Sequence, residues 1–341
     1  MKRLLFKLIT LAIGVGFGLL LAECGIRWYW YGADGFSYVQ LNSFKTLGWS
    51  GLLQRAENDT ILWELQPKLD TVFKFAPFTT NSLGMRDREY PKQKPANTFR
   101  IAVVGDSFAM GSGVSNEENY PEVPETLLAD GIAGKAVEVL NFGVGGYNLM
   151  NYEAVLRHKA LAFDPDLVIV GFCGGNDFRG PRKEHLEGKL RLRPPLEQFY
   201  RSHLWKLYRM ARNKKPRRTE LPKLNERQIG YMHERFAAIS ALCKANKIPV
   251  ALCYYSLVAK QEDANAIREL VEPYGIGFLN AGESLIGEPI GELMVHKLDA
   301  HPNARVHRVY AEALKEYLSS NNFLYEPPTI NADATAEQQA N

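Results

Sequence analysis

Cysteine is scarce in this sequence: the 341 residues include only four, and no two of them form a CxxC pair. Cysteines this few and this scattered exclude a disulfide framework and argue against a zinc site. The sequence also lacks the motifs of a phosphate-binding loop, of an HExxH metalloprotease and of the GxSxG elbow of α/β-hydrolases. Its net charge of only +3 gives no indication of a nucleic-acid partner. What is abundant is apolar material, 46% of the residues, which is enough for a sizeable folded core.

The N-terminus has the pattern of a membrane span. Residues 4–22 are mostly apolar and follow the cations Lys2 and Arg3. About 19 residues in a helix extend roughly 28 Å, close to the ~30 Å of a bilayer core. Because the cations precede the run, we expect the N-terminus in the cytoplasm and the rest of the chain outside it. The four aromatic residues 28–31 are expected to lie at the far membrane interface.

Two other interpretations of this segment are open. A cleaved signal peptide usually has a shorter apolar region and ends in a small-x-small cleavage site, which is not evident in this sequence. A lipoprotein would be modified at Cys24, but Glu23 stands where a small residue is required. We therefore expect a retained membrane anchor.

The rest of the chain divides by pattern. After the anchor and its aromatics, residues 1–31, we expect an extended arm and linker over residues 32–98, because they carry only short apolar runs and end in a polar, proline-bearing stretch. One of those runs, residues 71–75, predicts a short strand. A folded domain is expected at 99–325, interrupted at 178–224 by a proline- and arginine-rich insertion. The polar tail, 326–341, is expected to be disordered.

Within the expected domain, apolar runs alternate with amphipathic segments. The runs predict strands at 100–104, 137–140, 167–172, 249–255 and 276–279. The amphipathic segments predict helices at about 120–130, 148–162, 225–245, 261–271 and 303–318. Near-continuous apolar strands, each followed by a helix, indicate an α/β fold with a parallel sheet covered on both faces. Ligands of such sheets bind at the carboxyl ends of the strands.

Four short polar blocks stand at those ends. Ser107 follows the first strand, and a serine becomes a good nucleophile only when a base takes its proton. The glycines of residues 141–146 can expose backbone N–H groups, and Asn176 can donate its amide to an oxyanion. Asp299 and His301 are two residues apart, so in an extended segment both side chains lie on one side. Each block alone could be an ordinary turn or helix cap, but four in this order indicate a catalytic site.

With these blocks in place, the chain resembles the SGNH hydrolases, also called GDSL esterases or lipases. The resemblance covers about residues 99–318, where 105–107 match the block of the nucleophile and 174–177 match the block of the oxyanion asparagine. It implies a three-layer, flavodoxin-like α/β fold. Residues 81–89 are also similar to a segment found in membrane-anchored bacterial members. This similarity implies that the translocated domain lies in the periplasm.

At two positions the match to the family is less direct. Aligned on Asn141, the oxyanion glycine is Gly146, with Gly143 as the other candidate. Asp299 and His301 match the last block, although the family more often has Asp-x-x-His than the Asp-x-His of this chain. Some family members have this shorter spacing, and the resemblance to them implies that Asp299 is the carboxylate partner of His301.

The resemblance implies a two-step acyl transfer. His301 would take the proton of Ser107 as the serine attacks an ester carbonyl, and Asp299 would orient the imidazole. The oxyanion would be held by the backbone N–H groups of Ser107 and Gly146 and by the amide of Asn176. Such a mechanism needs neither a metal nor an organic cofactor. The expected substrate is an ester, or an acylated glycan or lipid.

Two alternatives to a simple esterase stay open. The same triad would serve an O-acyltransferase or deacetylase of an envelope polysaccharide, with a sugar hydroxyl replacing water as the acceptor in the transferase. A catalytically silent envelope protein that binds a glycan or a partner protein could keep the same fold. The filled catalytic positions argue against silence.

The insertion also carries a basic stretch, with apolar residues such as Trp205 and Tyr208 among or before its cations. The cations are Lys206, Arg209, Arg212, Lys214, Lys215, Arg217 and Arg218. The plainer interpretation is a solvated surface segment. The alternative is an amphipathic helix that lies near the anchoring membrane or receives an anionic glycan.

Overall fold

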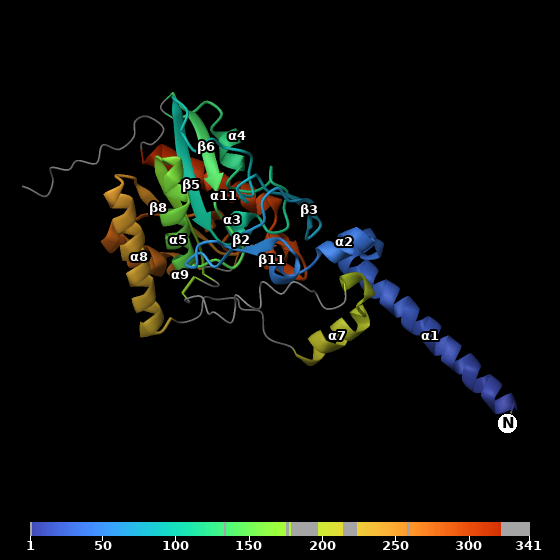
Figure 1. Ribbon diagram of the computed structural model, residues 1–341. Helices are drawn as coiled ribbons and strands as arrows, with labels where there is room; N and C mark the ends of the chain where they lie inside the picture. The colour runs from blue at the N-terminus through green and yellow to red at the C-terminus, as the bar shows by residue number, and fades with distance from the viewer. Residues whose placement is uncertain are drawn as a thin grey trace, which may run out of the picture.

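A five-stranded parallel sheet lies at the centre of the structure (Figure 1). The computed structural model describes residues 2–132, 134–174, 177–178, 197–213, 224–257 and 260–321. The strands are β5 (Thr98–Gly105), β6 (Ala136–Asn141), β7 (Leu167–Cys173), β8 (Val250–Tyr255) and β9 (Gly277–Asn280). Their order across the sheet is β6-β5-β7-β8-β9, and every neighbouring pair is parallel. The five predicted strands and their parallel arrangement are confirmed.

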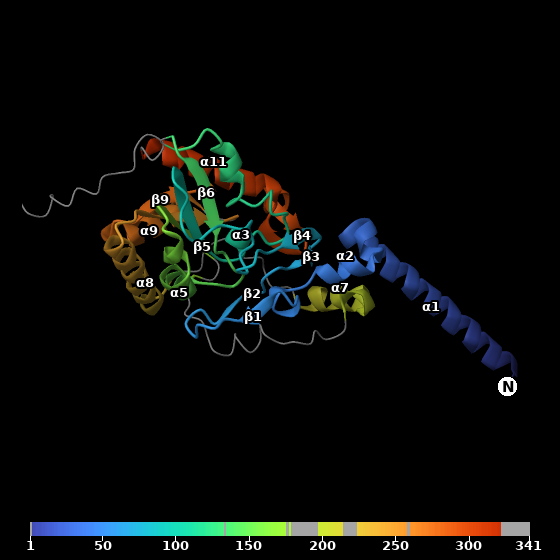
Figure 2. The same cartoon turned by 45° about the horizontal axis from the view of Figure 1, so that its top comes forward.

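Helices cover both faces of this sheet. Successive residues of a strand point to opposite faces, so β5 contributes Ala102 and Val104 to one apolar cluster and Ile101 and Val103 to the other. The first cluster includes residues of α5 (Leu149–His158), α8 (Glu226–Ala245) and α9 (Gln261–Val271). The second includes residues of α3 (Ser107–Met110), α4 (Val123–Leu127) and α11 (Ala304–Ser320). Figure 2 shows α4 and α11 on one side of the strands and α5 and α8 on the other, which is the predicted three-layer α/β architecture.

Two of the predicted helices are shorter than expected. The segment 120–130 is helical only over α4, because Pro121 and Pro124 lack the N–H that a helix interior donates and Pro124 stands in the first turn. The segment 148–162 is α5 followed by a 3-10 turn, η3 (Ala160–Phe163), which ends at the left-handed residue Asp164. The helices α8, α9 and α11 begin and end close to the predicted residues.

Residues 32–98 pack onto the sheet through short elements. These are η1 (Gly32–Phe36), α2 (Tyr38–Ser43), η2 (Leu47–Trp49), the antiparallel pair β1 (Leu53–Arg55) and β2 (Trp63–Leu65), and the hairpin of β3 (Asp70–Phe73) and β4 (Ala76–Thr79). Trp63 and Phe78 belong to the apolar cluster that includes α5. The strand predicted at 71–75 ends at Phe73, because Lys74 and Phe75 form the hairpin turn with positive φ angles of 51° and 71°.

The N-terminal helix α1 (Lys2–Tyr31) projects away from the sheet domain (Figure 1). By length and composition it could cross a membrane, and a signal sequence passes the same test. Its last turn departs from the expected aromatic interface. Trp28 and Tyr29 are exposed, but Trp30 and Tyr31 are buried in a cluster with Phe44. These two rings therefore attach α1 to the folded domain instead of facing lipid.

Arg86 connects residues 32–98 to the segment that follows β5. Its guanidinium is buried and donates to the carbonyl oxygen of Met110 at 2.8 Å and to Asn116 Oδ1 at 2.8 Å. It also donates to the carbonyl oxygens of Gly111 and Val114. Burial lowers the pKa of Arg86 to about 9, and the ion pairs formed among the described residues do not include it. Arg86 therefore satisfies the carbonyl groups at the carboxyl end of α3.

We expect Arg86→Met to lower the free energy of unfolding by about 3 kcal/mol, because several buried carbonyl groups would lose their donor. The matched control is Arg88→Met, since the half-exposed ion pair of Arg88 with Glu125 contributes at most about 1 kcal/mol. Thermal unfolding of both full-length variants in detergent measures the difference. Equal Tm values for the two variants would contradict this role of Arg86.

Candidate active site

Ser107 is the first residue of α3, directly beyond the carboxyl end of β5. The preceding Asp106 caps the helix, since its carboxylate accepts a hydrogen bond from the N–H of Phe108 at 2.9 Å. The Asp-Ser pair thus does form the ordinary helix cap that the sequence allowed. The cap also fixes the serine at the edge of the sheet where ligands of parallel sheets bind.

Asp299 and His301 lie in the antiparallel pair of β10 (Met294–His296) and β11 (Asp299–Pro302), just before α11. Asp299 Oδ1 accepts a hydrogen bond from the backbone N–H of His301 at 3.1 Å and also contacts Nδ1 of its ring. The Asp-x-His spacing is therefore sufficient for the carboxylate to hold the imidazole, because both side chains leave an extended segment on the same side.

The other ring nitrogen of His301 reaches Ser107. The distance between His301 Nε2 and Ser107 Oγ is 2.9 Å, which is a hydrogen bond. The ring of Phe108 packs beside the imidazole, with ring centroids 5.9 Å apart. The structure therefore brings together three of the residues predicted from the sequence, in the order Asp299, His301, Ser107.

Lys74 is a further member of this group, and sequence reasoning missed it. Its Nζ lies 2.6 Å from Asp299 Oδ2, 2.8 Å from Ser112 Oγ and 3.2 Å from His301 Nδ1. Burial alone would raise the pKa of Asp299, but the hydrogen bonds and charges of His301 and Lys74 hold that pKa well below its usual range. Burial lowers the pKa of Lys74, and Asp299 opposes this shift. Asp299 is thus kept ionised between two nitrogen partners.

Lys74 reaches Asp299 because of the backbone of its hairpin. The left-handed φ of Lys74 is uncommon for a residue with a side chain and persists only where surrounding contacts hold it. Those contacts come from Ser43 at the end of α2, whose carbonyl oxygen accepts from the N–H of Lys74 at 3.0 Å. Ser43 Oγ accepts from the N–H of Phe75, also at 3.0 Å. Residues 71–75 look like a short strand, and nothing in their sequence indicates a turn at Lys74. The contact between Lys74 and Asp299 could therefore not be predicted from the sequence.

The glycine loop after β6 has two candidates for an oxyanion donor. The N–H of Gly143 already donates to Asn141 Oδ1 at 2.9 Å, and a Cβ at this position would lie 2.7 Å from the backbone nitrogen of Met110. Gly143 is therefore glycine because α3 packs against it. Gly146 has a φ of 79° and lines the same cleft as Ser107. The geometry thus favours Gly146 over Gly143 as the group that a substrate would meet.

Asn176, the expected side-chain donor to the oxyanion, lies outside the described residues. Its neighbour Asp177 is described and fully buried. The Asp177 carboxylate accepts from the hydroxyl of Tyr152 at 2.7 Å and from the N–H of Cys173 at 2.6 Å. Burial, together with the charge of Asp106, raises the pKa of Asp177. This residue therefore anchors the chain where it leaves β7.

The Ser107 hydroxyl and His301 ring open into a cleft of about 650 Å³. Residues 44–48 form one wall, and Leu298 and Gly145 form others. Gln198 and Lys206 also line it, which brings part of the predicted insertion into the candidate site. Lys206 belongs to α7 (His203–Arg212), a helix within the insertion.

Lys206 is a half-buried cation surrounded by aromatic rings. Its Nζ lies 5.3 Å from the ring centre of Trp30, 5.6 Å from that of Tyr31 and 5.9 Å from that of Phe44. It donates a hydrogen bond to the hydroxyl of Tyr31 at 2.9 Å. Burial, with a smaller effect from the charge of Arg201, lowers the pKa of Lys206 to about 8. The sequence placed this lysine in a basic stretch, whose members Lys214, Lys215, Arg217 and Arg218 lie outside the described residues.

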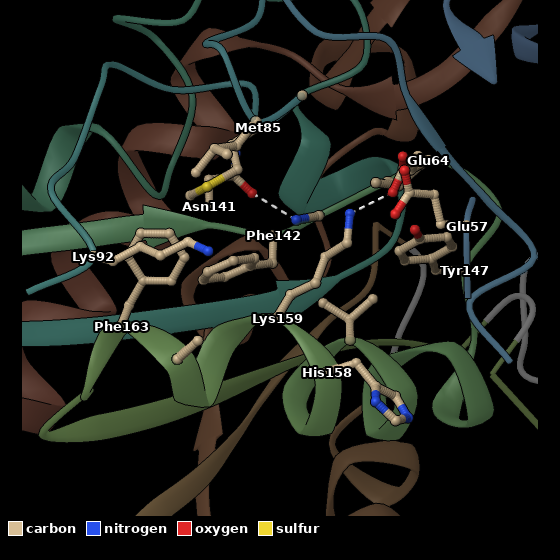
Figure 3. Close-up of a pocket in the computed structure, with 16 residues that line it drawn as sticks. Glu57, Glu64, Met85, Lys92, Asn141, Phe142, Tyr147, His158, Lys159 and Phe163 are labelled. Carbon is tan, nitrogen blue, oxygen red and sulfur yellow. Dashed lines mark hydrogen bonds and ion pairs between the residues drawn. The ribbon is translucent and has the colours of Figure 1, made fainter. Parts of the chain in front are cut away.

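A second pocket, of about 330 Å³, lies behind the glycine loop (Figure 3). Phe142, Tyr147 and Phe163 line it, and Lys159 points toward Glu64, with which it forms an ion pair. None of the triad residues lines this pocket. It is therefore separate from the cleft where Ser107 and His301 meet.

No group of three His, Cys, Asp or Glu side chains in the part of the chain that the structure describes is placed to hold an ion. The four cysteines, including Cys243 and Cys253, are free thiols.

Comparison with known proteins gives the family. The model of the GDSL-like Lipase/Acylhydrolase family matches residues 103–309, more than half of the chain. No curated protein sequence matches the chain.

Several solved structures are similar in fold. A G-D-S-L family protein from Desulfitobacterium hafniense is 15% identical, with a TM-score of 0.41 over 64% of this chain and 98% of its own. The esterase EstA from a Pseudoalteromonas species is 13% identical, with a TM-score of 0.40 over 65% and 97%. A catalytic mutant of an acetylxylan esterase from Geobacillus stearothermophilus is 16% identical, with a TM-score of 0.39 over 64% and 93%.

Membership rests on the family model and not on these low identities. The matched segment begins within β5 and ends within α11, and it includes both Ser107 and His301. The chain belongs to the GDSL-like lipase/acylhydrolase family, also called the SGNH hydrolases, and is an ester hydrolase.

Proposed function

We propose that Ser107 is the nucleophile of this hydrolase, His301 its general base and Asp299 the carboxylate that orients the base. The observation that carries the proposal is the 2.9 Å hydrogen bond between Ser107 Oγ and His301 Nε2, within the roughly 2.6–3.2 Å reach of a general base. With the Nδ1 hydrogen directed to Asp299, Nε2 accepts the serine proton. The imidazolium formed in this step is stabilised by a carboxylate that is already ionised.

The oxyanion hole of the proposal consists of the backbone N–H groups of Ser107 and Gly146 and the side-chain amide of Asn176. The first two residues border the same cleft, which supports their joint action on one carbonyl oxygen. Such donors act on the charge that develops in the transition state, where each contributes about 3–4 kcal/mol. Water then attacks the acyl-serine, and His301 acts as the base for this second step.

Lys74 acts through Asp299 in this mechanism. Its ammonium binds the carboxylate oxygen that the imidazole does not use, so Asp299 is held from both sides. With both of its oxygens bound, the Asp299 carboxylate is held in one orientation. This orientation in turn fixes the imidazole ring of His301. Lys74 is therefore a positioning residue.

The proposed substrate is an acyl ester of an envelope glycan or lipid, cleaved outside the cytoplasm by a domain that α1 tethers to the membrane. The apolar helix α1 and the cations before it support the tether and its orientation. The described lining of the cleft includes Lys45 and Lys206 but only one carboxylate, Asp299. These cations suit the polar or anionic leaving group of a glycan or phospholipid ester, and the apolar lining by Phe44, Leu47 and Leu298 suits an acyl chain.

We expect Ser107→Ala and His301→Ala each to lower the rate of p-nitrophenyl acetate hydrolysis by at least about 10³-fold, because nucleophile and base act as a unit. The matched control is Ser319→Ala, at the far end of α11, which should keep wild-type turnover. All variants should keep the wild-type Tm. Near-wild-type turnover in either of these two variants would contradict the assignment. Product analysis with a sugar acceptor, on the wild-type protein, separates hydrolysis from acyl transfer.

We expect Lys74→Met to lower kcat about tenfold, equivalent to ~1.4 kcal/mol, with little change in KM, since the Lys74 ammonium is bound by Asp299 and Ser112 and acts by orienting Asp299. Lys74→Arg keeps a cation beside Asp299 and should retain most of kcat. Steady-state kinetics with a soluble ester measure both. An equal loss in the two variants, or a change confined to KM, would show that Lys74 does not act by holding the carboxylate.

A further inference from the structure

The helix α7 meets α1 at a rigid junction. Glu23 of α1 accepts hydrogen bonds from the backbone N–H groups of His203 (2.9 Å) and Leu204 (3.1 Å), so its carboxylate caps the first turn of α7. His203 Nδ1 lies 2.9 Å from the same carboxylate. Arg27 of α1 donates to Glu23 at 3.1 Å and to the carbonyl oxygen of Phe199 at 2.6 Å. These contacts fix where α7 begins relative to α1.

The junction lies at the end of the apolar part of α1. The mostly apolar run ends at residue 22, one position before Glu23. Figure 1 shows α7 running across the axis of α1 at this level, instead of continuing along it. If α1 crosses a bilayer, a helix in this position lies along the membrane surface, at the depth of the lipid headgroups.

A groove of about 660 Å³ separates the two helices. Leu19 and Leu20 line it from α1, and Leu204, Trp205 and Tyr208 line it from α7. Most of the lining is therefore apolar and continuous with the apolar surface of α1, while Glu23, Arg27 and Arg201 border the groove with charged groups. An acyl chain beside Leu19 and Leu20 would reach it without leaving the hydrocarbon region.

The exposed surface of α7 has the composition of an interfacial helix. Trp205 is 60% exposed and Tyr208 is 51% exposed, and their rings stack with centroids 5.2 Å apart. Leu207 and Met210 are also exposed. Aromatic rings of this kind are enriched at membrane interfaces, where one part of the ring is in lipid and the other in water.

The charges of α7 are of one sign. Its ten residues contain Lys206, Arg209 and Arg212 and no Asp or Glu. Lys206 faces the catalytic cleft, whereas Arg209 and Arg212 are exposed. Each cation near an anionic membrane surface contributes about 1 kcal/mol of attraction.

We propose that α7 lies in the interface of the membrane that α1 crosses, with anionic phospholipid occupying the groove between the two helices. The proposal rests on the membrane anchoring included in the proposed function, and it adds a second membrane contact. Because Lys206 on the same helix lines the cleft, this contact places the opening of the active site beside the lipid surface. Ester substrates attached to lipid then reach Ser107 without leaving the membrane.

The test uses the full chain in lipid nanodiscs, because Glu23, Arg27 and Trp30 make contacts that a truncated chain would lose. Spin labels are placed singly at Tyr208→Cys, at Ile13→Cys and at Lys315→Cys, in a Cys24→Ser background. Cys173, Cys243 and Cys253 are buried, so they do not take the label. Collision of each label with oxygen and with a water-soluble nickel complex reports its depth in the bilayer.

In nanodiscs containing phosphatidylglycerol, labels at 208 and 13 should collide several-fold more with oxygen than with the nickel complex, and the label at 315 should do the reverse. A label at 208 that behaves like the one at 315, while the label at 13 is in lipid, would overturn the proposal but leave the anchor intact. A water-exposed label at 13 would overturn the anchor and the proposal together. Neither outcome affects the hydrolytic triad, which is tested separately with soluble ester.

A second experiment tests whether α7 recognises anionic lipid in particular. Changing Arg209 and Arg212 together to Gln, or replacing phosphatidylglycerol by phosphatidylcholine, should lower the oxygen-to-nickel ratio at position 208. The matched control changes Arg227 and Lys244, two exposed cations of α8, to Gln and should leave that ratio unchanged. A ratio that no change in charge affects would contradict recognition of anionic lipid.

Discussion

The hydrogen bond between Ser107 and His301 places the strictest constraint on how the chain folds. It joins residues 194 positions apart, so it forms only when β5 and β11 are both placed correctly. β5 is set by its parallel pairing with β6 and β7, and every residue of it is buried. β11 is set by its pairing with β10 and by α11, which packs on the opposite face of the sheet from α5. The buried sheet is thus the frame that holds Ser107 and His301 together.

Residues before the matched family segment support the catalytic group as much as the segment itself does. The family model begins at residue 103, yet Lys74 binds Asp299 and Arg86 binds the carbonyl groups at the end of α3. Residues 44–48 also form a wall of the cleft. The segment 32–98 therefore contacts Asp299 through Lys74 and the carboxyl end of α3 through Arg86. Residues outside the matched segment thus border both the cleft and the group formed by Ser107, His301 and Asp299.

The sequence was enough to predict the sheet and the proximity of Ser107, His301 and Asp299, and the physical reason is local. Buried parallel strands appear as continuous apolar runs, and the Asp-x-His spacing places both side chains on one side of an extended segment. The choice between Gly143 and Gly146 needed the structure, because only packing shows that α3 leaves no room at Gly143. Lys74 was missed because a left-handed turn, held by Ser43, interrupts what looks like a strand. Trp30 and Tyr31 were misplaced because an aromatic run at the end of a span looks the same whether its rings meet lipid or a protein core.

In the proposed mechanism, the Ser107 hydroxyl, activated by His301, forms the covalent bond to the acyl group. A fluorophosphonate reacts far faster with such an activated serine than with other side chains, so intact-mass and peptide analysis of the treated protein is the most direct measurement. The account predicts a single adduct, located on Ser107, in the wild-type protein, with no adduct in Ser107→Ala and much slower labelling in His301→Ala. An adduct at another residue, or labelling of Ser107→Ala at the wild-type rate, would contradict it.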